Sequence, residues 1–88
     1  MPTAQTVICN ELGLHARAAA KLVDLANRFA SEVTIGRADK SVNGKSIMGV
    51  LMLAAAKDSL VSVSTEGEDA DQALAALLTL IDSGFGEN

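Results

Sequence analysis

The chain has 88 residues, which is room for one hydrophobic core, so we expect a single domain over residues 1–88. Hydrophobic residues make up 49% of the chain, but only Phe29 and Phe85 are aromatic, which predicts an aliphatic core. The formal net charge of −4 excludes the basic surface that nucleic-acid binding needs. No stretch approaches the roughly 20 apolar residues of a membrane span, and residues 1–6 lack the pattern of a signal peptide. We therefore expect a soluble cytoplasmic protein with no membrane insertion.

The single cysteine, Cys9, limits the redox and metal chemistry open to the chain. One cysteine cannot form an intrachain disulfide or a pair of metal-binding or redox-active thiols. Because Cys9 lies in an apolar run, we interpret it as a small buried hydrophobic residue in a reducing compartment. We expect no metal and no cofactor.

The first third of the chain predicts a strand, a turn and a helix. Strand-forming residues fill Thr6 to Cys9, and residues 10–13 then break this run in a turn. From Ala16 to Phe29, apolar residues recur at helical spacing, with charged side chains on the opposite side. The apolar positions of this amphipathic helix are Ala19, Leu22, Val23, Ala26 and Phe29.

The middle of the chain predicts a hairpin and a short helix. Val33 and Ile35 alternate with polar residues, and a polar turn at 37–39 precedes a run through Val42, which indicates two short antiparallel strands. Ser46 then precedes a run of helix formers from Ile47 to Ala56. We predict a second helix over this run, with Ser46 as its N-cap.

The last third predicts one more strand and the longest apolar stripe. Val61 and Val63 alternate with serines, as in a half-buried strand. Asp69 and Gln72 have the spacing of a capping box, and Gly84 ends the helix that follows. The stripe of this third helix consists of Leu74, Leu77, Leu78 and Ile81.

The order of elements, β-α-β-β-α-β-α, predicts an α+β fold. Two split β-α-β halves share one four-stranded antiparallel sheet, and the three helices cover one of its faces. The other face meets water, which makes the fold an open-faced β-sandwich.

The only histidine stands where the first turn meets the first helix, in Gly13-Leu14-His15-Ala16-Arg17. The free N–H groups of Ala16 and Arg17 and the positive end of the helix dipole favour a bound anion there. The same dipole favours a neutral imidazole, whose ring nitrogen can attack phosphorus. The Arg17 guanidinium suits phosphate oxygens, and Gly13 lets the backbone approach closely. We predict a phosphoryl-accepting site, with a helix-capping histidine as the simpler alternative.

The second predicted helix is apolar on nearly every side, so some of its apolar residues face solvent. We assign Val50 and Leu53 to the core, and Ile47, Met48 and Leu51 to an outward patch. Such a patch is typical of a transient protein interface, and a fully buried helix is the alternative. Ser46 has an ordinary role as N-cap.

Two segments resemble the signatures of a known family. Gly13-Leu14-His15-Ala16-Arg17-Ala18-Ala19 resembles the active-site signature of HPr, the histidine-containing phosphocarrier protein of the bacterial phosphoenolpyruvate-dependent phosphotransferase system. Lys45-Ser46-Ile47-Met48-Gly49-Val50-Leu51 resembles the second signature of that family at the matching distance, and the resemblance extends over essentially the whole chain. Ala18 stands where the family often has proline, but both residues suit the first turn of a helix.

The resemblance implies a stoichiometric carrier rather than an enzyme. His15 would accept phosphate on Nδ1 from phospho-enzyme I and donate it to an enzyme IIA domain, with Arg17 assisting. The second helix would dock these partners, and HPr kinase/phosphorylase would regulate docking through Ser46. A donor that meets two partners through one face is best served by being a monomer.

The family serves two pathways, sugar uptake and a phosphorelay that regulates nitrogen and potassium metabolism. Gly84-Phe85-Gly86-Glu87 and Leu51-Met52-Leu53 resemble the regulatory branch.

Other classes of small protein fit the sequence less well. An RNA-binding domain of this element order would carry aromatic side chains on its strands, and a metal chaperone would carry paired cysteines. A carrier domain with a prosthetic group on serine would be helical. A small-molecule-sensing or protein-interaction module stays the alternative, although it leaves the placement of His15 and Arg17 unexplained.

Overall fold

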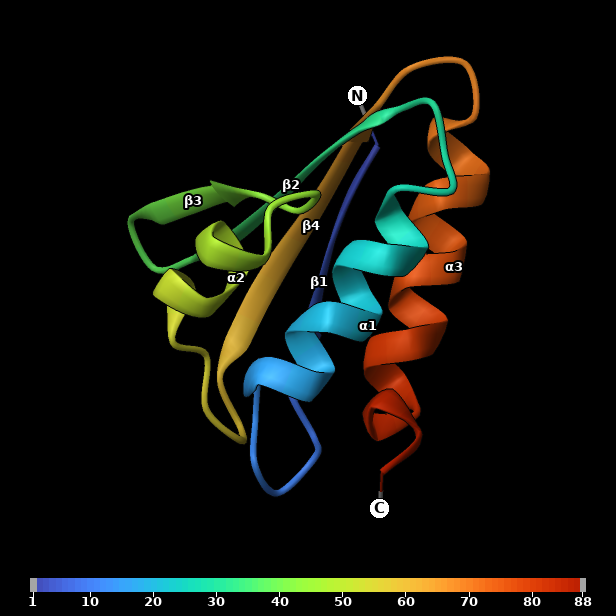
Figure 1. Ribbon diagram of the computed structural model, residues 1–88. Helices are drawn as coiled ribbons and strands as arrows, with labels where there is room; N and C mark the ends of the chain where they lie inside the picture. The colour runs from blue at the N-terminus through green and yellow to red at the C-terminus, as the bar shows by residue number, and fades with distance from the viewer. Residues whose placement is uncertain (1, 88) are drawn as a thin grey trace.

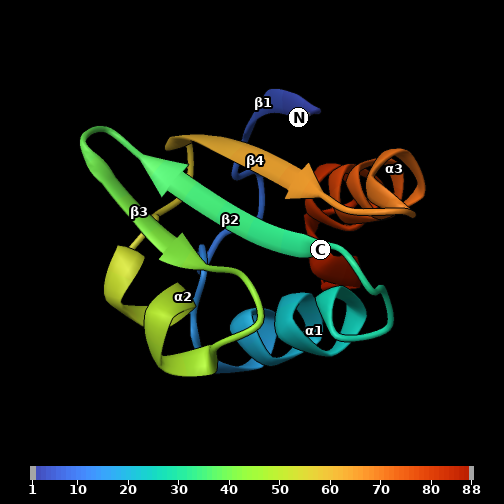
Figure 2. The same cartoon turned by 90° about the horizontal axis from the view of Figure 1, so that it is seen from above.

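The computed structural model describes residues 2–87 and contains one sheet covered by helices on one face (Figures 1 and 2). The strands lie in the order β1-β4-β2-β3, and every neighbouring pair is antiparallel. The predicted α+β class, element order and open-faced sheet are thereby confirmed. The elements are β1 (Thr3–Val7), α1 (Ala16–Ala26), β2 (Glu32–Arg37), β3 (Lys40–Asn43), α2 (Ile47–Leu53), β4 (Leu60–Glu66), α3 (Ala70–Asp82) and the short 3-10 turn η1 (Gly84–Gly86).

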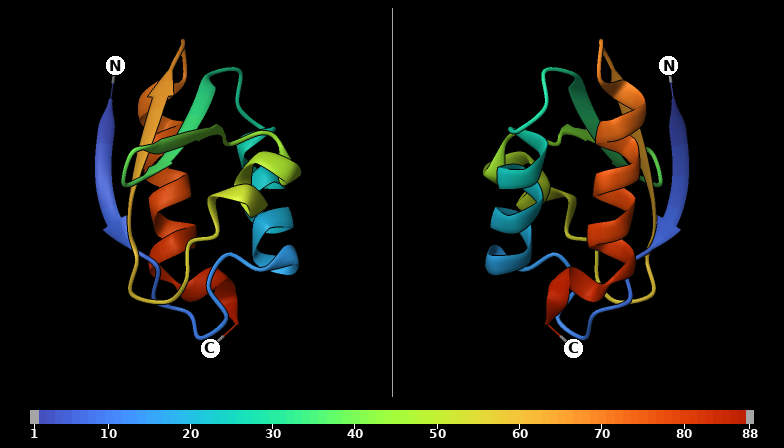
Figure 3. Two further views of the ribbon diagram at one scale, coloured as in Figure 1. Left: turned by 90° about the vertical axis from the view of Figure 1, so that its left-hand side faces the viewer. Right: turned by 90° about the vertical axis from the view of Figure 1, so that its right-hand side faces the viewer.

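Strand β4 lies inside the sheet, where it pairs with β1 on one side and with β2 on the other. Val63 pairs with Ala4 on one side and with Ile35 on the other. Because side chains alternate along a strand, Val61 and Val63 point toward the helices and are buried, whereas Leu60 is exposed on the open face. The two side views of Figure 3 show the sheet on one side of the molecule and the helices on the other.

The core lies between the sheet and the helices and is aliphatic apart from one ring. Phe85 is 1% exposed and belongs to this core, although it follows α3. The other large apolar side chains that are fully buried are Ile8, Leu22, Ile35, Val50, Leu53, Val61, Val63, Leu77 and Ile81.

Helix α1 buries one stripe and ends earlier than the sequence predicts. It ends at Ala26 with Asn27 as C-cap, not at Phe29. The N–H groups of Arg28 and Phe29 donate to carbonyls three residues back, at 3.0 and 3.2 Å, so the chain tightens into turns there. The stripe consists of Ala18, Ala19, Leu22, Val23 and Ala26.

The prediction that Cys9 is buried is wrong. The first strand spans Thr3–Val7 rather than Thr6 to Cys9, and Ile8 after it turns into the core. With Ile8 inside, the next side chain points outward, and Cys9 is exposed.

Two further details differ from the predictions. Helix α2 ends at Leu53 rather than Ala56, because Ala54 adopts a left-handed conformation with φ +55° that cannot continue a helix. At the start of α3, Asp69 is the N-cap residue but makes no capping hydrogen bond, so the capping box with Gln72 does not form. Its carboxylate instead accepts hydrogen bonds from Ala30 and Ser31, in the loop after α1.

Candidate functional site

His15 is the N-cap of α1, as the sequence predicts. Its backbone is extended, and its Nδ1 accepts a hydrogen bond of 3.3 Å from the N–H of Arg17. Ala16 and Arg17 form the first turn, whose N–H groups have no partner within the helix by its geometry. The predicted phosphate-binding backbone therefore stands directly beside the imidazole.

Backbone contacts with the segment after α2 hold the loop that precedes His15. Gly13 has φ +65° and lies against Ala55 and Ala56. The N–H of Leu14 donates to the carbonyl oxygen of Ala55 at 2.9 Å, and the Leu14 side chain is buried. The start of α1 is thereby fixed against its neighbouring segment.

The second ring nitrogen of His15, Nε2, contacts the carboxylate of Glu87, a residue that follows α3. Nε2 lies 2.8 Å from Oε1 and 2.9 Å from Oε2 of Glu87. A carboxylate only accepts hydrogen bonds and a backbone N–H only donates them. The contacts with Glu87 and with the Arg17 N–H therefore place the ring proton on Nε2 and leave the lone pair on Nδ1.

Two neighbours keep the Glu87 carboxylate ionised. Hydrogen bonds from the His15 ring and from the Asn10 side-chain amide hold the pKa of Glu87 below its ordinary value of 4.5, and the positive charge of Arg17 acts in the same direction. His15 is 24% exposed and Glu87 12% exposed at their side chains, so the pair lies at the surface but is partly shielded from water.

The segment 83–87 brings Glu87 to the ring, and the sequence analysis did not find this contact. Phe85 fills a core position with φ +57°, between Gly84 and Gly86, which also have positive φ. The Nζ of Lys21 on α1 donates to the Phe85 carbonyl at 2.8 Å. In Figure 1 this segment and the loop into α1 lie at the same end of the molecule. The glycines signal a turn, but nothing in the sequence names its partner.

Helix α2 packs against α1 and places most of its residues as predicted. Ser46 is the N-cap, with its Oγ accepting from the Gly49 N–H at 3.2 Å. Val50 and Leu53 are buried, and Ile47 and Met48 are exposed. Leu51, predicted to point outward, is half-buried and packs on the core, whereas Met52 is 69% exposed and was not assigned.

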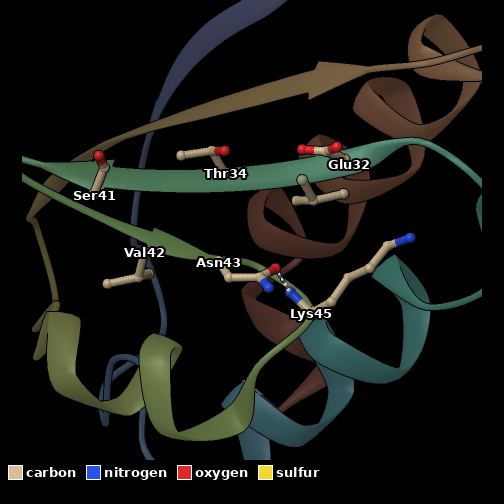
Figure 4. A pocket seen from close by; sticks show the side chains of 7 residues that line it. Glu32, Thr34, Ser41, Val42, Asn43 and Lys45 are labelled. Carbon is tan, nitrogen blue, oxygen red and sulfur yellow. Dashed lines mark hydrogen bonds between the residues drawn. The ribbon is translucent and has the colours of Figure 1, made fainter.

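A hollow of about 350 Å³ lies between β2, β3 and the start of α2, at the end of α1 away from His15 (Figure 4). The polar groups around it bind their own chain. The Asn43 side chain accepts from the Lys45 N–H at 2.9 Å, and the Lys45 Nζ donates to the Phe29 carbonyl at 2.8 Å. The His15 site is therefore the stronger candidate for chemistry.

Within residues 2–87, no group of three or more His, Cys, Asp or Glu side chains is placed to hold a metal ion. Over the same residues, no helix has the length and apolarity needed to cross a membrane.

A family model described as "PTS HPr component phosphorylation site" matches residues 2–83. The chain belongs to the HPr family. It is 54% identical over 82 residues to the phosphocarrier protein HPr of Cupriavidus necator, covering 93% of this chain and 92% of that protein. It is 45% identical over 83 residues to the phosphocarrier protein NPr of Shewanella violacea, covering 94% of this chain and 91% of that protein. The resemblance found in the two signatures is confirmed.

Solved HPr structures share the fold. The crystal structure of HPr-C-His from Thermoanaerobacter tengcongensis has a TM-score of 0.96 and 42% identity, covering 100% of this chain and 99% of that one. The crystal structure of an HPr dimer from the same organism has a TM-score of 0.79 and 42% identity, covering 99% of this chain and 100% of that one. This HPr-family chain is thus a phosphocarrier of the phosphotransferase system with the open-faced HPr architecture.

Proposed function

We propose that this HPr-family protein carries a phosphoryl group on Nδ1 of His15. Phospho-enzyme I donates this group to His15, and His15 passes it to an enzyme IIA domain. The observation that carries the proposal is the state of the ring: Nε2 donates to Glu87 at 2.8 Å, which leaves the Nδ1 lone pair at the N-terminus of α1. The protein acts as a stoichiometric carrier rather than an enzyme, because a surface site on so small a domain depends on its partners to complete it.

In the accepting step, the Nδ1 lone pair forms a bond to phosphorus while the bond from phosphorus to the donor atom breaks, and its electron pair returns to the donor. The phosphoryl oxygens accept hydrogen bonds from the N–H groups of Ala16 and Arg17. The bond from the Arg17 N–H replaces the one of 3.3 Å that this N–H donates to Nδ1 before phosphorylation. The Arg17 guanidinium offsets the negative charge. Donation reverses these events on the next protein.

The exposed side of α2 supplies the docking surface for both partners. Ile47 and Met48 are 45% and 69% exposed and stand on a helix that packs beside α1. Leu51 is half-buried and packs on the core, so its part in docking is to support the surface rather than to form it. Flexible apolar side chains of this kind suit repeated, short-lived contacts with different proteins.

Ser46 is the regulatory phosphorylation site of the proposal, modified by HPr kinase/phosphorylase. As the N-cap of α2 it lies next to the docking surface. A phosphate there adds a charge of about −2, which the helix dipole tolerates but an acidic partner does not. The expected result is slower docking without unfolding. Incubation with a cognate kinase and ATP that leaves Ser46 unmodified contradicts this part.

The proposed carrier works in the cytoplasm as a monomer, since it meets two partners through one face. The HPr of T. tengcongensis has also been crystallised as a dimer. Sedimentation velocity at working concentrations should give one monomeric species, and a stable dimer would contradict the proposal.

The central experiment is incubation with enzyme I, Mg²⁺ and labelled phosphoenolpyruvate. Wild-type protein should take up label that is lost in acid, because the N–P bond is acid-labile, and His15→Ala should take up none. Lys40→Ala, a change at an exposed basic residue of the β2–β3 hairpin, is the matched control and should label like the wild type. Absence of label on the wild type, with an enzyme I proven active on its own HPr, would show that the proposed function is wrong.

A further inference from the structure

We infer that Glu87 is a positioning residue for phosphoryl transfer: its carboxylate keeps the proton on Nε2 of His15 while Nδ1 carries the phosphoryl group. The inference rests on the proposed function of His15. Both Glu87 oxygens lie within hydrogen-bond distance of Nε2, at 2.8 and 2.9 Å. The carboxylate therefore stands on the side of the ring opposite the nitrogen that reacts.

The proton on Nε2 determines how good a leaving group the His15 imidazole is when the phosphoryl group is donated. When the Nδ1 lone pair becomes the N–P bond and Nε2 keeps its proton, the ring carries a positive charge, which the Glu87 carboxylate balances. In donation the N–P bond breaks, its electron pair returns to Nδ1, and the ring departs as neutral imidazole. A ring that had lost the Nε2 proton would have to depart as an anion, which is a far poorer leaving group.

The segment that carries Glu87 is anchored before any phosphate arrives. The Phe85 side chain is 1% exposed, and its carbonyl accepts from the Nζ of Lys21 at 2.8 Å. The N–H of Glu87 donates to the Gly84 carbonyl at 3.1 Å. Asn10, which is fully buried, donates through Nδ2 to Glu87 Oε1 at 2.8 Å. These contacts hold the carboxylate in place on its own chain, so little ordering is needed when the ring becomes charged.

The other charged groups near the ring do not replace Glu87. Arg17 and Lys21 come from α1 and are positive, so they oppose a positive ring. Glu11, in the loop before His15, is paired with Lys57 at 2.8 Å. Among residues 2–87, Glu87 is thus the acidic group bonded to the imidazole.

The test compares the phosphorylated forms of the wild type, Glu87→Ala and Glu87→Gln. The ¹⁵N shift of Nε2 reports its protonation at neutral and at mildly alkaline pH, and rapid-quench kinetics give the rate of donation to an enzyme IIA domain. Glu87→Ala should lose the Nε2 proton at mildly alkaline pH, where the wild type keeps it, and should donate on the order of tenfold more slowly. Glu87→Gln keeps an acceptor oxygen without the charge and should lie between the two.

Glu68→Gln is the matched control, because it removes one exposed carboxylate in the loop before α3, at the other end of the molecule, and should behave as wild type. If phosphorylated Glu87→Ala keeps its Nε2 proton and donates at the wild-type rate, the inference is wrong while the labelling of His15 still stands. If the wild type takes up no label, both the proposed function and the inference are wrong. Urea unfolding of each variant separates these outcomes from loss of the fold.

Discussion

Gly13 lies so close to Ala55 that a Cβ atom on Gly13 would stand 2.6 Å from the Ala55 carbonyl oxygen. That oxygen accepts the N–H of Leu14 at 2.9 Å, so it cannot move away without loss of a hydrogen bond. The contact joins the loop before His15 to the segment after α2. The position of the His15 ring therefore depends on a close approach of two backbones.

Gly13→Ala should lower the free energy of unfolding by about 3 kcal/mol, because it combines a left-handed backbone with a steric clash. Gly86→Ala is the matched control, since Gly86 has φ +70° and open space around its Cβ position. The control should lose only about 1 kcal/mol, from the backbone conformation alone. Urea denaturation measures both variants, and equal losses would contradict the role of the Ala55 contact.

Two substitutions at Ser46 separate capping from charge. Ser46→Ala removes the 3.2 Å bond to the Gly49 N–H and should lower the free energy of unfolding by about 1 kcal/mol, with phosphate acceptance unchanged. Ser46→Asp keeps a capping oxygen and should retain wild-type stability, but its charge should slow acceptance from enzyme I. Thermal unfolding and labelling rates distinguish the effects. Fast labelling of Ser46→Asp would argue against charge control of docking.

Met48→Glu should slow phosphate acceptance from enzyme I on the order of tenfold or more and leave stability nearly unchanged. The reason is that Met48 is 69% exposed, so a charge there faces the partner and not the core. The matched control is Leu60→Glu, which places the same charge at an exposed apolar position on the open face of the sheet. Initial rates at several protein concentrations measure the effect. An unchanged rate for Met48→Glu means that α2 is not the docking surface.

Asp69 should make stability depend on pH in the acid range. Hydrogen bonds from the side chain of Ser31 and from the N–H groups of Ala30 and Ser31 hold the pKa of Asp69 below its ordinary value of 3.8. Because the folded value is the lower one, the ionised carboxylate stabilises the fold fully above pH 3.8, and this contribution is lost as the pH falls through the folded value.

Asp69→Asn should therefore reduce the urea midpoint at neutral pH and flatten its fall in acid. Glu68→Gln, at the exposed neighbouring position, should keep the wild-type profile. The two profiles are compared by urea titrations from neutral pH into acid. An acid profile of Asp69→Asn that matches the wild type would rule out this role of the carboxylate.

Local patterns in the sequence predicted the order of the elements and the starts of α1 and α2. The alternation at Val61 and Val63 and the stripe through Leu22 follow from the geometry of a strand and a helix, which depends on neighbours a few residues apart. The capping positions of His15 and Ser46 are local for the same reason, and both are N-caps in the structure. The site residues that the sequence identified are those whose surroundings lie within one turn of helix.

The tertiary structure decided the partners that come from far along the chain. Glu87 contacts His15, which is 72 positions away in the sequence. The Asp69 carboxylate, expected to cap its own helix, accepts a hydrogen bond from Ser31, which is 38 positions away. The spacing of apolar residues along the sequence does not predict such pairs, because they depend on how α3 and the turn that follows it pack against α1. Cys9 was misplaced for a related reason, since the burial of Ile8 set which side chain faces water. The sequence by itself determined the fold and the candidate histidine at the start of α1, and only the packing of distant segments determined which groups surround that ring.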